Sequence, residues 1–323
     1  MKGLNFLKNR HLNNDAMQRL TVGFALILMM IIFSIASPYF LKIDNLMTIA
    51  LQTAITGITG YGMTYVLISS AVDLSVGSSI AFTSVVCSML IEAKVNMVVA
   101  ILLTMVVGCI VGALNATMVA KMKMPPFIAT LGAQMALRGL ALAMTDAKPI
   151  YVEIPIFKQI AQYRLFDVVP LPVIYMLVLG VIASFILRKT VIGRNIYAVG
   201  SNEEAARLSG IDVTKIRMFA YMICGVMAAV AGVIMTSRVN SGQPSIAIGY
   251  EANAVAASVI GGASMRGGHG TISGTILGAF ILGVLMNGLN LMNINQNLQM
   301  FATGIVVILA VYFDKLRMMR NAS

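Results

Sequence analysis

The stretch NMVVAILLTMVVGCIVGALNATMVA, residues 96–120, carries no charged side chain from end to end, and Lys94 and Lys121 flank it. As an α-helix rising about 1.5 Å per residue, it is longer than the roughly 30 Å hydrocarbon core of a bilayer. The stretch therefore predicts a helix that crosses a membrane.

Similar apolar runs recur along the whole chain. Of its 323 residues 59% are hydrophobic and 11% are charged, whereas a soluble domain carries roughly 25% charged residues. We predict an all-α polytopic membrane protein, one transmembrane domain over 1–323 with about ten helices and no sizeable soluble domain. The predicted spans lie near 20–40, 46–69, 75–91, 96–120, 126–145, 170–188, 216–238, 250–264, 270–290 and 298–313.

Basic clusters between the spans predict the orientation. Cytoplasmic loops of membrane proteins are enriched in Lys and Arg. The arm 1–19, the loop 189–215 and the tail 314–323 are basic, and ten spans place all three on the cytoplasmic side. Segment 146–169 would then lie outside, as a cap or short helices. The run from Leu20 to Ala36 is longer than a usual signal-peptide core, which favours a retained first span over a cleaved leader.

Several function classes are disfavoured. The formal net charge is +11. The basic residues behind it lie in the short segments between the apolar runs, as in membrane proteins, so the charge does not indicate nucleic-acid binding. The three cysteines lie inside apolar runs without ligand spacing, and no phosphate-binding GxxxxGK[ST] loop occurs. We therefore expect no disulfide, no metal, no cofactor bound by this chain and no catalysis.

The two halves of the chain show signs of an internal repeat. A constant shift of 172 residues pairs spans two to five with spans seven to ten. Halves of five spans each would be inverted in the membrane, a common transporter plan. The shift aligns Gly60 with Gly232, Met63 with Met235, Thr64 with Thr236, Gly77 with Gly249, Asn115 with Asn287, and Gly132 with Gly304.

Polar residues interrupt the apolar runs. Asp73, in AVDLSVGSS (71–79), either caps the third span by accepting the N–H of Ser75 or Val76, or contributes to a polar passage. Asn115 and Asn287 either bond neighbouring helices or line that passage, and Arg138 either snorkels outward or pairs with an acid. The candidate pathway residues are Asp73, Ser75, Asn115, Gln134, Arg138, Gln243, Glu251 and Asn287.

Glycines four residues apart indicate close helix packing rather than a phosphate cradle. Two such stripes occur, one with Gly108 and Gly112 and the other with Gly270, Gly274 and Gly278.

The polar stretch GRNIYAVGSNEEAARLSGID, residues 193–212, is unusual in the middle of a chain that is otherwise mostly apolar. Within EEAARL a helix would put Glu203, Glu204 and Arg207 on a charged face. Ala205, Ala206 and Leu208 would form a small apolar face. The alternative is a solvated loop with no partner.

Six motifs together resemble the permease subunits of ribose-type ABC sugar importers, in the branched-chain amino acid and ribose permease superfamily. The resemblance runs from about residue 20 to the C-terminus. The family typically has GIDLSVGS and GGTSLxGGxG, where this chain has Ala71 and Val72, and Ala263 and Met265; these departures could affect the substrate. The motifs are VDLSVGS (72–78), PPFIATLG (125–132) with RG (138–139), GRNIYAVGSNEEAARLSGI (193–211), SGQPSIAIGYE (241–251), VIGGASMRGGHGTISG (259–274) and GVLMNGLNLMNI (283–294).

The resemblance implies a permease of the bacterial inner membrane that acts as a homo- or heterodimer within the lipid. It would work with a cytoplasmic ABC ATPase, which uses ATP and Mg²⁺, and a periplasmic sugar-binding protein. The substrate would be a ribose-like pentose, a hexose or a related polyol; branched-chain amino acids, nucleosides or an ion-coupled secondary transporter are the alternatives. It also implies that segment 193–212 couples to the ATPase through Arg194, Asn202, Glu203, Glu204, Ala205, Arg207 and Leu208.

The basic clusters make a prediction about topology. Single cysteines at Ser201 and Ile156, in a variant lacking the three native cysteines, should react oppositely with a membrane-impermeant thiol reagent. From outside intact cells only the cysteine at 156 should be labelled. Equal labelling of both positions from outside contradicts the ten-span orientation.

Overall fold

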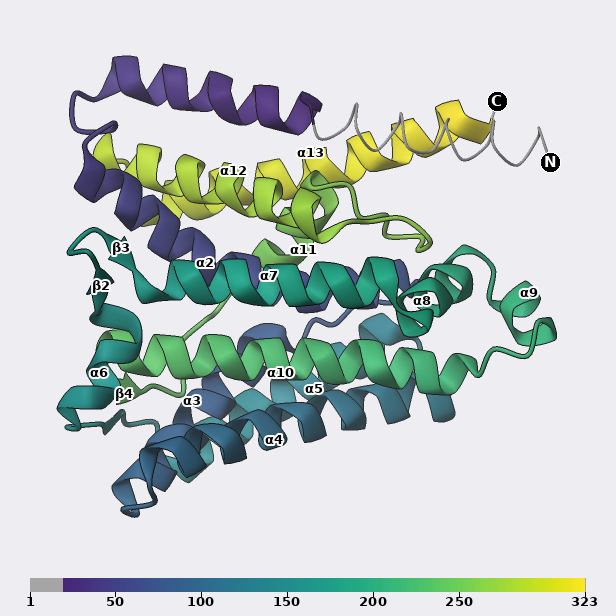
Figure 1. Ribbon diagram of the computed structural model, residues 1–323, viewed down its shortest axis with the longest axis horizontal. Coiled ribbons are helices and arrows are strands. Elements are labelled where there is room, and N and C mark those ends of the chain that lie inside the picture. The colour runs from purple at the N-terminus through teal and green to yellow at the C-terminus, as the bar shows by residue number, and fades with distance from the viewer. Residues whose placement is uncertain (1–19, 323) are drawn as a thin grey trace.

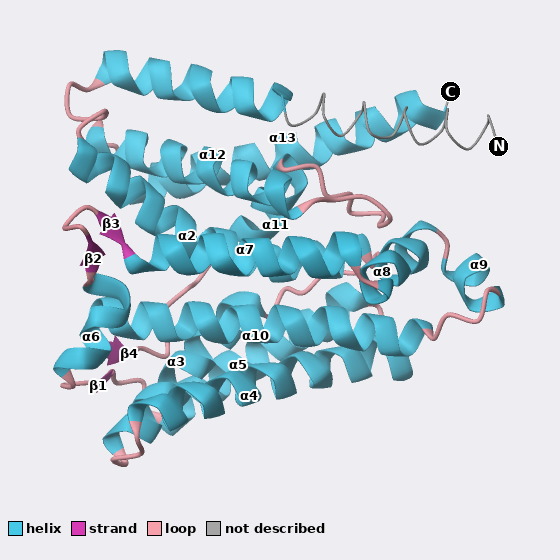
Figure 2. Cartoon of the chain, in the orientation of Figure 1, coloured by secondary structure: helices cyan, strands magenta, loops and turns pink. Residues whose placement is uncertain are grey.

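A computed structural model describes residues 20–322; the whole predicted cytoplasmic arm, 1–19, and residue 323 of the predicted tail lie outside the described residues. The described chain is built almost entirely of helices, with short strands at one end of the bundle (Figure 2). In this part of the chain, five helices are long and apolar enough to cross a membrane. They cover Met97–Lys121, Pro126–Met144, Leu171–Lys189, Val213–Val239 and Ile272–Leu291.

The elements follow one another as an extended bundle (Figure 1). A helix over Leu20–Ala36 comes first. After it come α2 (Ile43–Ile68), α3 (Val76–Glu92), α4 (Met97–Ala116), the π-helix η1 (Thr117–Lys121), α5 (Pro126–Met144), β1 (Ile150–Tyr151), α6 (Pro155–Gln162), β2 (Arg164–Leu165), β3 (Val169–Pro170), α7 (Leu171–Lys189), α8 (Val191–Ser201), α9 (Glu203–Leu208), α10 (Val213–Val239), β4 (Ser241–Gly242), α11 (Tyr250–Ile260), α12 (Ile272–Leu291) and α13 (Gln296–Ala322).

A helix lies in each of the ten predicted ranges, but the eighth range is not filled. Helix α11 has 11 residues, about 16 Å at 1.5 Å per residue, which is too short to cross a bilayer alone. It ends at Ile260, and Gly262 has a φ of 99°. The predicted helix over 250–264 is therefore wrong at its C-terminal end, which lies at Ile260. The number of membrane crossings stays a prediction.

Helix α10 lies at the centre of the bundle and packs closely on α4. A Cβ atom at Gly108 would collide with the carbonyl of Gly225, and one at Gly112 would collide with the carbonyl of Tyr221. Small residues thus let the two backbones approach each other, as is common in membrane helix pairs. The apolar side chains of the outward surface of α4 remain exposed, in keeping with contact with lipid.

Glycines also join α11 to α12. A Cβ atom at Gly274 would collide with the carbonyl of Gly261, and one at Gly278 with the carbonyl of Ala257. Gly270 does not share this face, because α12 begins only at Ile272 and Gly270 precedes it with a φ of 154°. The predicted three-glycine stripe is thus a stripe of two.

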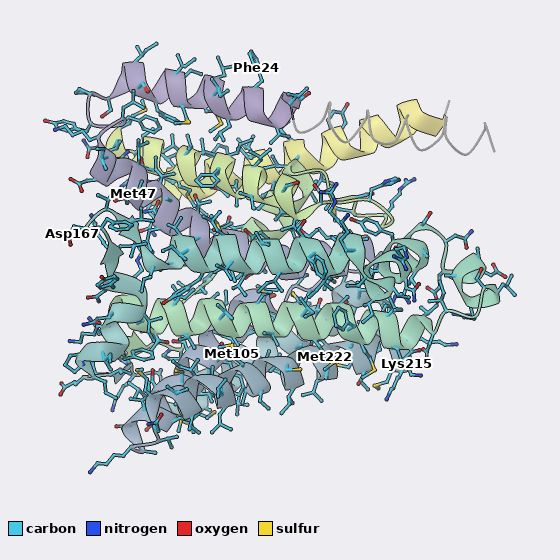
Figure 3. All side chains as sticks on the ribbon, viewed as in Figure 1. Phe24, Met47, Met105, Asp167, Lys215 and Met222 are labelled. Atoms are coloured by element: carbon cyan, nitrogen blue, oxygen red, sulfur yellow. The ribbon has the colours of Figure 1, made fainter. Side chains whose placement is uncertain are left out.

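The two ends of the bundle differ. Segment 146–169 forms α6 and short antiparallel strand pairs, β1 with β4 and β2 with β3. Helix α9 and the end of α13 lie at the opposite end (Figure 1). The charged residues Asp167 and Lys215 mark these two ends, while Met105 and Met222 lie between them (Figure 3). The molecule has an apolar middle and two polar ends.

The α4–α10 contact predicts the effect of a single methyl group. Gly112→Ala should lower the thermal unfolding midpoint of the purified protein, because overpacking a tight contact costs about 1–3 kcal/mol. Gly23→Ala is the matched control, since a Cβ there meets nothing within 4 Å. Equal midpoints for the two variants would show that the backbones are not in close contact.

Candidate functional site

Two breaks in the helical framework meet inside the bundle. Residues 69–75 separate α2 from α3, and residues 240–249 separate α10 from α11. The first residues of α3 and α11 touch, because a Cβ at Gly77 would collide with the carbonyl of Ala247 and the carboxylate of Glu251. Gly249, just before α11, has a φ of 85°, which glycine adopts without strain. Glycine is therefore required on both sides of this contact.

The first break is held by a buried carboxylate. Asp73 is 2% exposed. Its Oδ1 accepts the backbone N–H of Ser75 at 2.9 Å and the Ser75 hydroxyl at 2.6 Å. Asn115 of α4 donates to Asp73 Oδ1 at 3.3 Å and to Ser75 Oγ at 2.7 Å. Asp73 thus accepts the Ser75 N–H, as expected of a cap, while Ser75 itself is the residue before the helix.

Two further residues hold this break, and sequence analysis missed both. Tyr221 of α10 donates its hydroxyl to the carbonyl of Val72 at 3.0 Å. Thr130 of α5 accepts the N–H of Leu74 at 3.1 Å. A tyrosine or threonine inside an apolar helix gives no sequence signal of a partner so far away in the chain.

The second break is held by α5. Gln134 donates to Glu251 Oε1 at 3.2 Å, and Glu251 Oε2 is buried without a protein partner. Arg138, one turn further along α5, donates to the carbonyls of Pro244 and Ile246, each at 2.7 Å. Arg138 therefore binds two backbone carbonyls of the second break, and Glu251 lies near enough to interact with it electrostatically.

Helix α5 is the least buried of the five long apolar helices. Met135 is 72% exposed beside the half-buried Gln134. A charged group facing hydrocarbon costs about 2.5–3.5 kcal/mol on insertion scales, so such groups lie toward water or protein. In the single chain, the polar cluster of Gln134, Arg138 and Glu251 therefore lies beside the exposed face of α5.

One candidate pathway residue, Asn287, lies apart from this cluster, whereas Gln243 lies within the second break. Asn287 of α12 exchanges two amide hydrogen bonds with Asn45 of α2, at 3.0 and 2.9 Å. Asn115 and Asn287 thus belong to separate networks, and each bonds a neighbouring segment, which was one of the two roles expected of them. Gln243 donates to Ser241 Oγ at 3.2 Å, next to β4.

The polar segment in the middle of the chain forms two helices, α8 and α9, and α9 projects from the end of the bundle (Figure 1). Asn202 caps α9 by accepting the N–H of Ala205 at 2.9 Å. Glu203 binds Arg207 and Arg217, each at 2.7 Å, so its carboxylate ties α9 to α10. Leu208 is 85% exposed at the tip of α9.

These contacts change the faces expected of α9. The Glu203 carboxylate is engaged within the chain, so it is not a free charge for a partner. Ala206 is buried, whereas Ala205 and Leu208 are exposed, so the expected apolar face is reduced to Ala205 and Leu208. Of the residues expected to couple to the ATPase, those exposed are Arg194, Asn202, Glu204, Ala205, Arg207 and Leu208.

Broken helices that meet inside an apolar bundle, with polar side chains at the break, define a helical membrane transport protein. Among the residues that the structure describes, no group of three or more His, Cys, Asp or Glu could hold a metal ion.

Comparison with known proteins gives the family. Residues 45–311 match the model of the family described as branched-chain amino acid transport system / permease component. The chain belongs to this family of permeases. No solved structure matches the chain.

Several named relatives cover almost the whole chain. The ribose import permease protein RbsC of Escherichia coli K12 is 41% identical over 296 residues, which are 90% of this chain and 91% of the relative. RbsC of Bacillus subtilis is 40% identical over 303 residues, 94% of each chain. The D-allose transport system permease protein AlsC of Escherichia coli is 35% identical over 295 residues, 91% of this chain and 90% of the relative.

The buried network predicts energetic coupling between Asp73 and Asn115. Asn115→Leu should lower the thermal midpoint, because the carboxylate and the Ser75 hydroxyl lose a buried donor, a loss of about 1–3 kcal/mol. In Asp73→Asn the same Asn115→Leu change should cost measurably less. Additive midpoint changes for the double variant would contradict a shared network.

Proposed function

We propose that the chain is the permease subunit of an ABC importer for a monosaccharide. The substrate is a ribose-like pentose, a hexose or a related polyol, carried across the bacterial inner membrane. Relatives named as ribose import permeases support this over nine-tenths of the chain, and the named allose permease extends the support to a hexose. The chain itself catalyses no reaction.

The observation that carries the proposal is the contact between the two breaks. Unpaired backbone and polar side chains at membrane depth are tolerated where they are buried in protein or line a water-filled cavity. At the second break, Gln134, Arg138 and Glu251 offer donors and acceptors suited to sugar hydroxyls. Glu251 Oε2 has no partner within the described chain. We place the sugar pathway along this cluster.

A second permease chain completes the pathway. It covers the exposed face of α5, and the passage runs between the two chains, identical or not. This arrangement keeps the half-buried polar residues of α5 away from lipid and supplies the second wall that one chain lacks.

We also propose that the chain crosses the membrane ten times. Ten crossings place both termini and α9 in the cytoplasm and segment 146–169 outside. The third crossing combines residues 69–75 with α3, and the eighth combines residues 243–249 with α11. The 172-residue shift relates Gly77 to Gly249, one glycine at the start of each short helix, which supports inverted five-helix halves.

Segment 189–215 docks the cytoplasmic ATPase, which uses ATP and Mg²⁺, while a periplasmic binding protein delivers the sugar. A continuous set of contacts leads inward from α9. Glu203 binds Arg217, and one turn along α10 Tyr221 binds Val72 in the first break. A force on α9 thereby reaches the pathway through one rigid helix.

Branched-chain amino acid import is the second candidate, favoured by the description of the family model. The test is uptake by proteoliposomes containing the permease and its ATPase, supplied with binding protein. Labelled ribose, allose or arabinose should accumulate only with ATP, and leucine should not. Accumulation of leucine alone establishes the second candidate, and sugar uptake without the ATPase contradicts an ABC mechanism.

Docking through α9 predicts a binding defect. Leu208→Glu should reduce co-purification of the ATPase by at least about tenfold, since burying a charge costs more than 1.4 kcal/mol, the equivalent of one decade in affinity. The control is Ile156→Glu, an exposed apolar residue at the opposite end of the bundle. ATPase recovery equal in both variants shows that α9 is not the docking element.

A further inference from the structure

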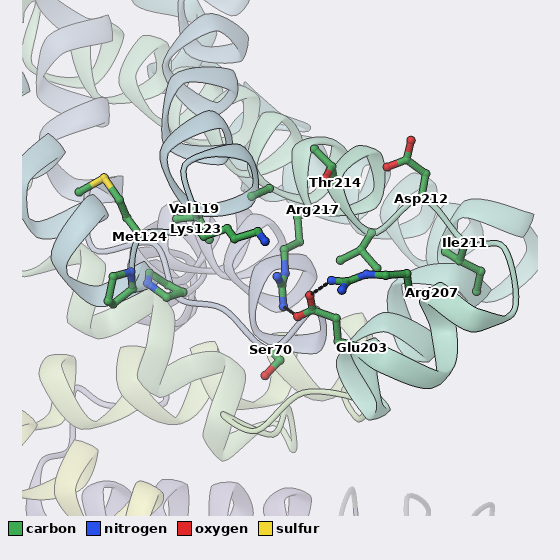
Figure 4. A pocket seen from close by; sticks show the side chains of 14 residues that line it. Ser70, Val119, Lys123, Met124, Glu203, Arg207, Ile211, Asp212, Thr214 and Arg217 are labelled. Atoms are coloured by element: carbon green, nitrogen blue, oxygen red, sulfur yellow. Dashed lines mark hydrogen bonds and ion pairs between the residues drawn. The ribbon is translucent and has the colours of Figure 1, made fainter.

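A cavity of about 650 Å³ opens at the end of the bundle that carries α9. Four parts of the chain surround it: Ser70 in the first break, η1 with the turn before α5, helix α9, and the start of α10 with the residues before it (Figure 4). It is separate from the cluster around Glu251. The residues that line it include Lys123, Glu203, Arg207, Asp212, Thr214 and Arg217.

The charges in this cavity do not balance. Lys123, Arg207 and Arg217 converge on it, and Glu203 divides its carboxylate between the two arginines (Figure 4). Among the side chains that the structure describes, Lys123 has no ion-pair partner. The cavity therefore holds more positive than negative charge.

Asp212 does not restore the balance. It accepts the backbone N–H of Lys215 at 3.0 Å and pairs with the Lys215 ammonium at 3.1 Å. These contacts, the backbone one first, hold the pKa of Asp212 below its ordinary value. Its carboxylate points away from Glu203 (Figure 4).

Arg217 also has an unused donor. Its side chain is 16% exposed, and its buried Nε finds no hydrogen-bond acceptor. A buried donor without a partner costs about 1–3 kcal/mol. The exposed Lys123 lines the same cavity as Arg217 (Figure 4), and like charges that face one cavity repel each other. An anion in the cavity would offset this repulsion, and a small shift of Arg217 would let its Nε donate to the anion as well.

We propose that this cavity, which we name the Lys123–Arg217 pocket, binds a phosphate ester. A guanidinium fork and an ammonium are the side chains that recognise phosphate oxygens. The volume of about 650 Å³ leaves room for an organic part beside the phosphate group. Two sources have this chemistry, the headgroup of an anionic phospholipid and a soluble phosphate ester.

Occupancy of the pocket acts on α9. Glu203 and Arg207 belong both to the pocket wall and to the ion pairs that hold α9 on α10. A bound phosphate competes with Glu203 for Arg217 and alters the attachment of α9. This consequence for coupling rests on the proposed function, whereas binding itself does not.

The test compares phosphate binding by two variants, each of which lacks one of two neighbouring lysines. Lys123→Gln removes a charge that lines the pocket, and Lys121→Gln removes an exposed charge two residues away that does not line it. Each protein is delipidated in neutral detergent. Thermal unfolding is then followed against glycerol phosphate and inorganic phosphate, with sodium chloride at matched ionic strength. A second arm uses nanodiscs of phosphatidylcholine with or without phosphatidylglycerol.

Wild type and Lys121→Gln should be stabilised by phosphate beyond the chloride control. Half-saturation for Lys123→Gln should be at least about fivefold weaker, because one charge-assisted bond is lost. Stabilisation by the soluble ester identifies a metabolite-type ligand, and stabilisation only in phosphatidylglycerol nanodiscs identifies a lipid headgroup. Equal stabilisation of both lysine variants, or none in either arm, overturns the proposal.

Discussion

Irregular backbone is costly inside a membrane, because no water satisfies its N–H and C=O groups. This chain carries two such segments, and the rest of the bundle is arranged to satisfy them. Asn115 and Tyr221 donate to the first break. Arg138 donates to two carbonyls of the second. The donors come from α4, α5 and α10, so the order of helices around the breaks follows from their hydrogen-bonding needs.

Close packing makes these contacts possible and connects them to the polar end. The glycines between α4 and α10 bring Asn115 and Tyr221 to the same break. Helix α10 also carries Arg217, which binds Glu203 of α9. One helix thus links the projecting segment, the Lys123–Arg217 pocket and the first break. This continuity is the physical basis for the proposed coupling between α9 and the break.

The sequence was sufficient for properties that depend on local composition. Long apolar runs predicted the helices, and the polar stretch predicted a helical segment outside them. The sequence could not predict which residues far apart in the chain bind each other. The sequence left open whether Asn287 bonds a neighbouring helix, and it could not name Asn45 as the partner. Nor could it show that Glu203 binds Arg217. The end of α11 at Ile260 was also missed, because glycines such as Gly261 and Gly262 also occur inside packed membrane helices and do not by themselves mark a helix end.

The central claim is that the polar cluster on α5 faces a water-filled passage. The direct measurement is the reactivity of a cysteine at Gln134 toward a charged thiol reagent in the assembled, cysteine-free importer. The account predicts reaction at Gln134 and loss of reaction when sugar and its binding protein are added with a non-hydrolysable ATP analogue. A cysteine at Val181, exposed on α7, should stay unreactive in lipid. No reaction at Gln134 in any state, or reaction equal to that at Val181, would contradict the account.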